Sequence, residues 1–213
     1  MFKEVVQLVG AELSGINAKQ YAADIARFHR IQASPGFHEA VEYVREALEE
    51  LGYSVTVHKY PADGRTLYLD GYRAPIGWRL ISGELKVVKP RKMLLGRVID
   101  NPTVVVAHSG ANPGVEAELV DVGRGDSDEY YEDVDVSGKF VLASGSPRRV
   151  HRKAIEERGA TGIILYSERT RAPSAYPYRS LWPRAEETDK MGMAFSISLE
   201  KALMLKRLLA NGR

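Results

Sequence analysis

The first sixty residues combine three helical periodicities with one alternating segment. Apolar side chains recur every three or four positions in residues 3–13, which predicts an amphipathic helix. A second helix is expected to have Asn17 as its N-cap, because Gln20 stands three residues later in the capping-box position. A third follows Ser34, a typical N-cap, and ends at a glycine. Residues 53–58 then alternate apolar and polar side chains, as a half-buried strand does. The pattern predicts an N-terminal helix-helix-strand flank.

The remainder of the chain alternates short apolar runs with helical patterns. Frequent Pro and Gly mark residues 61–82 as a connector. Helices are expected to begin at Ser146 and Ser198, both common N-cap residues. Turn-bounded apolar runs predict strands at residues 84–88, 103–108, 115–122, 139–143, 162–166 and 193–197. Strands alternating with helices indicate an α/β fold with a β-α-β crossover inside residues 133–167.

Composition narrows the class of protein without naming a function. Of 213 residues, 44% are hydrophobic and 27% are charged, which is typical of a globular protein. A net charge of +2 gives no overall attraction to nucleic acid or to an anionic membrane. No apolar run is long enough for a membrane span, and the first residues lack the apolar core of a signal peptide. The absence of cysteine fits a reducing compartment. We expect a cytoplasmic protein that contacts neither nucleic acid nor membrane.

Histidine and serine spacing provide no catalytic signature. None of the five histidines stands two residues before Asp or within H-E-x-x-H, the spacings common in zinc sites. His108 and Ser109 are adjacent, and neighbouring side chains at a strand end point to opposite faces, so the two cannot easily pair as base and nucleophile. There is also no G-x-S-x-G elbow. We expect neither a metal site nor catalytic residues in this chain.

One helix start is a candidate anion site. Ser146 opens a helix directly after a glycine, and Arg148 and Arg149 follow in its first turn. Backbone N–H groups and guanidinium groups together bind phosphate or carboxylate. Because no phosphate-binding glycine motif accompanies them, a capped helix with solvated arginines is the favoured alternative.

A long loop, residues 169–190, is the candidate contact surface. It is rich in Pro and carries three large aromatic side chains, Tyr176, Tyr178 and Trp182. Tyr and Trp frequently anchor partner proteins or peptides, and loops this long in compact domains are often functional. The alternative is a loop that folds onto its own domain.

Two segments resemble one known family. Residues 104–167 resemble a protease-associated (PA) domain, a non-catalytic module of peptidases. The resemblance is carried by VVAHSG, ELVDVG, the turn DVSGK leading into FVLASG, and RGATG leading into IILYS. Residues 17–60 are similar to the N-terminal elements of PA-containing zinc aminopeptidases, through RIQASPG, the amphipathic helix after it and LGYSVTVHKY. The family more often has Gly at the position of Ala33.

The resemblance implies a division of the chain and of its role. Residues 1–66 would be the flank of a peptidase-like domain, 67–83 a connector, 84–197 a PA-like mixed β-barrel or sandwich, and 198–213 a return helix. The family's zinc ligands lie downstream of the PA module, so zinc is expected only in a catalytic domain outside this chain. We expect a non-catalytic portion of a zinc aminopeptidase that limits substrate access. The alternatives are a free-standing module that binds a peptide or protein, and an anion-binding or hydrolytic role at residues 146–149. Exposed apolar faces in residues 1–60 would favour a homodimer.

Overall fold

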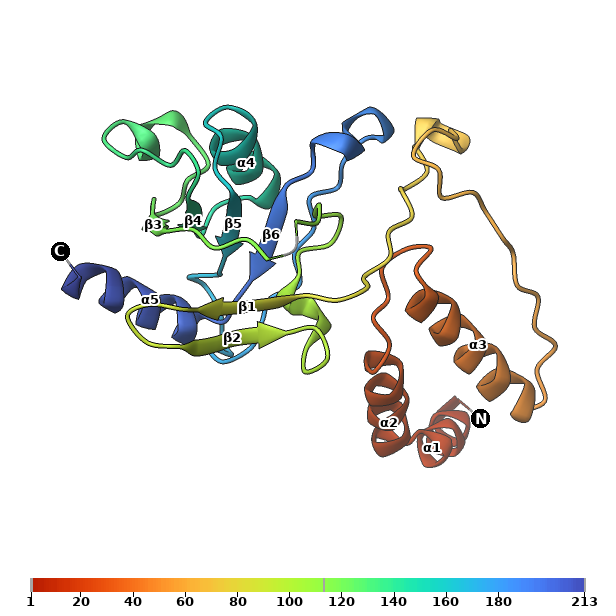
Figure 1. Cartoon of the computed structure of the whole chain (residues 1–213). Coiled ribbons are helices and arrows are strands. Elements are labelled where there is room, and N and C mark those ends of the chain that lie inside the picture. The colour runs from red at the N-terminus through yellow and green to blue at the C-terminus, as the bar shows by residue number, and fades with distance from the viewer. Residues whose placement is uncertain (1, 113, 213) are drawn as a thin grey trace. The chain divides into compact units, whose positions relative to one another are not determined.

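The chain divides into two compact units, Met1–Pro61 and Ala62–Arg213. The computed structural model describes residues 2–112 and 114–212. The first unit is helical, and both sheets belong to the second (Figure 1). The finer division into a connector and a return helix stays a prediction.

Three helices make up the first unit: α1 (Phe2–Glu12), α2 (Gly15–Ala26) and α3 (Pro35–Glu50). The N-cap of α2 is Ser14, so the prediction of Asn17 was wrong. Ser14 has extended backbone angles, and its hydroxyl accepts the Asn17 N–H at 3.1 Å, which places Asn17 inside the first turn. Ser34 caps α3 as predicted, and its Oγ accepts the Phe37 N–H at 3.2 Å.

The strand predicted at residues 53–58 does not form as a paired strand. The segment after α3 carries no strand assignment and pairs with no other strand among the residues described. Strand hydrogen bonds require a neighbouring strand, and this unit contains no second one within its described part. The alternation of side chains therefore predicted a strand, but it carries no information on whether a second strand is present to pair with it.

The second unit contains two sheets (Figure 1). One is a parallel sheet in the order β3-β4-β5-β6, formed by β3 (Leu119–Asp121), β4 (Phe140–Ala143), β5 (Gly162–Leu165) and β6 (Met193–Ser196). The other is an antiparallel hairpin of β1 (Glu84–Val87) and β2 (Met93–Arg97). The structure is therefore α/β, with a sheet of parallel strands beside a small antiparallel one.

Helices cover both faces of the parallel sheet. α4 (Pro147–His151) continues as a π-helical turn, Arg152–Glu156, and joins β4 to its parallel neighbour β5, as the predicted β-α-β unit requires. Alternate strand residues face opposite sides. Val141 and Ile163 pack with α4, whereas Leu142 and Ile164 pack with α5 (Leu199–Asn211) and the hairpin. Both faces are buried, which explains why β4 and β5 are continuous apolar runs.

Two predicted strands are shorter than expected. In residues 103–108, a 3-10 turn (Pro102–Val104) replaces the start of the strand, and only isolated bridges at Val105 and Ala107 remain. Asn101 favours that turn, because its side-chain carbonyl accepts the Thr103 N–H at 3.0 Å. The strand predicted at 115–122 is confined to β3, whose three residues are the ones that pair with β4.

Among the residues described, no helix is both long and apolar enough to cross a bilayer.

Candidate functional site

The loop between β5 and β6 is anchored at its middle. The Ala107 N–H donates to the Arg179 carbonyl at 2.9 Å, and the Leu181 N–H donates to the Ala107 carbonyl at 3.0 Å. Leu181 is fully buried in the core. These bonds fix the position of Ser180, which lies between the two anchored residues.

His108 is buried beside this anchor and is flanked by the two tryptophans of the chain. Its ring lies 6.0 Å from Trp78 and 5.4 Å from Trp182, centroid to centroid. Nε2 lies 3.0 Å from the Ile76 carbonyl, and Nδ1 lies 2.9 Å from Ser180 Oγ. A carbonyl oxygen only accepts, so Nε2 carries the proton and Nδ1 accepts the Ser180 hydroxyl. Burial lowers the pKa of His108 and favours this neutral form.

Two residues of this cluster have unusual backbone angles. His108 has φ 65° and Trp182 has φ 46°, a region that costs an L-residue about 1–2 kcal/mol. The Trp182 N–H donates to Ser180 Oγ at 3.3 Å. Bulky residues held at positive φ concentrate at functional sites. We name Trp78, His108 and Trp182 the aromatic site.

The three predicted contact residues lie in different surroundings. Tyr178 and Trp182 are about half exposed, at 51% and 49%. Tyr176 packs against the core, its hydroxyl donates to the Leu95 carbonyl, and Lys201 Nζ donates to the same hydroxyl at 2.5 Å. A contact role for the three stays a prediction, and Tyr178 and Trp182 are the two with free surface to offer.

The candidate anion site already contains carboxylates. The Asp126 carboxylate accepts the Ser146 N–H and pairs with Arg124 at 2.9 Å. Burial raises the pKa of this carboxyl group, but the Arg124 pair and the Ser146 hydrogen bond outweigh burial, and the pKa is lowered. Arg148 pairs with Glu187 at 2.6 Å, while Arg149 is exposed. An anion would have to compete with both acidic side chains, so the structure offers no support for the site, and anion binding stays a prediction.

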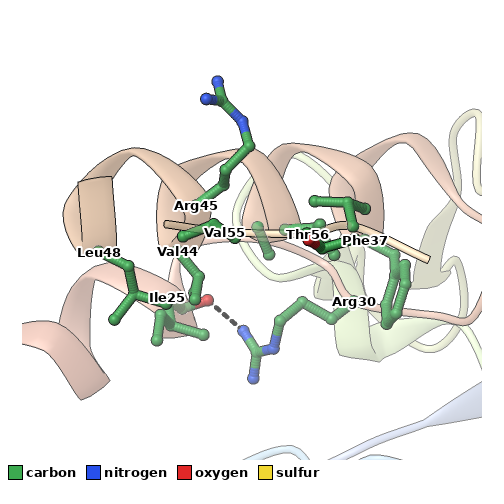
Figure 2. Close-up of a pocket in the computed structure, with 11 residues that line it drawn as sticks. Ile25, Arg30, Phe37, Val44, Arg45, Leu48, Val55 and Thr56 are labelled. Atoms are coloured by element: carbon green, nitrogen blue, oxygen red, sulfur yellow. Dashed lines mark hydrogen bonds between the residues drawn. The ribbon is translucent and has the colours of Figure 1, made fainter. Parts of the chain in front are cut away.

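The first unit has an apolar groove between its helices and the segment after α3 (Figure 2). Its volume is about 410 Å³. It is lined by Ile25, Arg30, Phe37, Ala40, Val41, Val44, Arg45, Leu48, Val55, Thr56 and Val57. Arg30 donates to the Ile25 and Phe28 carbonyls, and Arg45 is paired with glutamates of α3. Because both arginines already have partners, the groove is mainly an apolar surface.

Metal ligation is not supported by the residues described. Within 2–112 and 114–212, no three His, Asp or Glu side chains come together as a metal site would require. That this chain holds no zinc of its own stays a prediction.

Sequence reasoning missed the partnership of His108 with Ser180. It considered Ser109, which is adjacent, whereas the residue that pairs with the imidazole lies 72 positions away. No local motif connects the two positions. The only sequence signal was the presence of both tryptophans in Pro-rich segments.

Comparison with known proteins gives a likeness of fold. No family model and no curated protein matches the chain. Among solved structures, it is similar to BSAP, a zinc aminopeptidase from Bacillus subtilis, with TM-score 0.54, 16% identity, and 89% of this chain and 41% of that chain covered. It is also similar to an aminopeptidase from Aneurinibacillus sp. strain AM-1, with TM-score 0.47, 20% identity, and 91% and 40% covered.

The chain thus spans about two fifths of the length of the solved structures it matches. At these identities the likeness concerns the fold alone. It agrees with the α/β architecture described above.

Proposed function

We propose that this chain is the non-catalytic, PA-like portion of a zinc-dependent aminopeptidase. In this role it borders the active site and limits which peptides enter. The observation that carries the proposal is the match of 89% of the chain to 41% of a zinc aminopeptidase. The resemblance of residues 104–167 to PA domains supports it.

The surfaces of the two units suit such a role. The first unit presents an apolar groove and an unpaired extended segment, as part of a larger α/β domain would. The second unit presents Tyr178 and Trp182 on an anchored loop. Half-exposed aromatic side chains in a fixed position suit contact with a peptide.

The test is an activity assay of the chain itself. With zinc added and an aminoacyl-nitroanilide as substrate, the proposal expects no turnover above the background of zinc alone. Adding a separately expressed catalytic domain of such an enzyme, one that lacks this portion, should change its preference between short and long peptides. Chelator-sensitive turnover by the chain alone would overturn the proposal.

A second candidate is a free-standing module that binds a peptide or protein. The half-exposed Trp182 ring against His108 favours it, since an exposed indole is a common anchor. The chain has two tryptophans, and both flank His108. Peptide binding at the aromatic site should therefore change the tryptophan emission of the whole chain, and Trp182→Ala should abolish that change while Trp78 still emits.

A further inference from the structure

The parallel sheet of the second unit continues beyond β6. One isolated bridge joins Phe195 of β6 to Val105, and a second bridge joins Ala107 to Ser180. The short segment that holds Val105 and Ala107 therefore lies next to β6. Residues 179–181 of the loop between β5 and β6 lie next to that segment and form an edge of the extended sheet.

The backbone groups of this edge point alternately toward the sheet and away from it. Arg179 and Leu181 direct theirs inward, since the Arg179 carbonyl and the Leu181 N–H both bond to Ala107. The groups of Tyr178 and Ser180 therefore point outward. Among the residues that the structure describes, they make no backbone hydrogen bond. Each of these two residues thus offers one free donor and one free acceptor.

Two prolines limit the length of the open edge. Pro177 precedes Tyr178, and Pro183 follows Trp182. Proline has no N–H to donate, and the Trp182 N–H already donates to Ser180 Oγ. An edge this short is protected against pairing with another whole sheet. A short extended peptide can still add to it, because such a peptide needs only a few main-chain hydrogen bonds.

The side chains of the edge leave room for one large side chain of a peptide. Alternate residues of an extended segment face the same side, so Tyr178, Ser180 and Trp182 share one face, while Leu181 is buried on the other. Ser180 is small and lies between two half-exposed aromatic residues. A residue paired with Ser180 is a diagonal neighbour of both rings, at a distance that aromatic side chains can span.

We propose that an extended peptide adds to this edge as an antiparallel strand, with a large apolar or aromatic residue opposite Ser180. A strand backbone presents a donor and an acceptor at every second residue, as the open groups of Tyr178 and Ser180 require. The antiparallel direction is the more stable one per residue. Main-chain hydrogen bonds hold the peptide, and the two rings select the side chain between them. The inference rests on the proposed function, since it names how this portion binds the peptides that reach it.

A blocked pentapeptide of sequence STFTS tests the pairing on the whole chain. Its phenylalanine is the single large side chain and therefore fixes the register opposite Ser180. At saturating peptide, hydrogen exchange of the Tyr178 and Ser180 amides should slow. The Leu181 amide is the internal control, because its N–H already bonds to Ala107 and its exchange rate should not change.

Three N-methylated forms of the peptide test the alternation. In the proposed pair the phenylalanine N–H donates to the Ser180 carbonyl, whereas the N–H groups of both threonines point away from the edge. Methylation of the phenylalanine nitrogen should weaken binding by about two- to tenfold. Methylation of either threonine nitrogen should leave the affinity unchanged. Equal effects of all three methylations would overturn the proposal, as would the absence of saturable binding at millimolar peptide.

A pair of tyrosine variants tests the contribution of the rings. Tyr178→Ala should weaken binding of the pentapeptide by about two- to tenfold. Tyr72→Ala is the matched control, because Tyr72 is another exposed tyrosine of the same unit, and it should leave binding unchanged. Equal losses in the two variants would contradict the assignment. Binding is measured without zinc or a catalytic domain, so its failure is distinguishable from a failure of the turnover assays that test the proposed function.

Discussion

Replacing Ala33 by glycine should stabilise the turn that begins α3. Ala33 has φ 58°, is exposed, and directly precedes the capping Ser34. Its Cβ in the left-handed region costs about 1–2 kcal/mol. Glycine removes that cost but loses about 0.5–1 kcal/mol in backbone entropy. The net gain should be about 0.5–1 kcal/mol.

Hydrogen exchange of the first turn of α3 measures this gain. The Phe37 N–H, which donates to Ser34 Oγ, should exchange about two- to fivefold more slowly in Ala33→Gly. Ala22→Gly is the matched control, because Ala22 is an exposed residue inside α2. That change should destabilise its helix by about 1 kcal/mol. Faster exchange in Ala33→Gly would refute the argument that backbone strain is stored at this turn.

Three further predictions concern the second unit. Burial holds the pKa of His108 in the folded chain below its ordinary value of 6.5, so the unfolded chain binds the proton more readily. The free energy of unfolding is therefore independent of this group above pH 6.5 and decreases as the pH falls from 6.5 toward the lowered pKa. Urea unfolding followed by tryptophan emission should show this slope, and His108→Gln should reduce it; an unchanged slope would contradict the assignment. Gly110→Ala should destabilise by about 3 kcal/mol or more, since a Cβ there would lie 1.8 Å from the Met191 carbonyl oxygen, and an unfolding midpoint like that of the native chain would count against this packing. Phosphate should leave the amide signals of residues 146–149 unshifted, because Asp126 already accepts the Ser146 N–H; a saturable shift would restore the anion site.

Elements with both local signals and buried neighbours could be predicted from the sequence. β4 and β5 are buried on both faces, so their apolar runs were distinctive, and Ser34 followed by Pro marked the start of α3. Residues 53–58 show the limit of this reasoning, because alternation describes a side-chain pattern and not the presence of a partner strand.

The aromatic site depended on information that no local pattern carries. His108 meets Ser180 and Ile76 through contacts between segments 72 and 32 positions apart. Histidine is among the residues that adopt positive φ more often than most, but this tendency does not identify the tertiary contacts that His108 makes at φ 65°. Ala33 is the opposite case, because the family resemblance had already indicated glycine at that turn.

The most direct test of the central claim measures metal and turnover on one sample of the 213-residue chain. The chain is equilibrated with zinc, passed through a desalting column, analysed for bound metal and assayed on an aminoacyl-nitroanilide. If the catalytic residues lie outside this chain, it will retain no stoichiometric zinc and cleave no substrate. Retention of one or more zinc ions per chain together with turnover that a chelator abolishes would contradict the account.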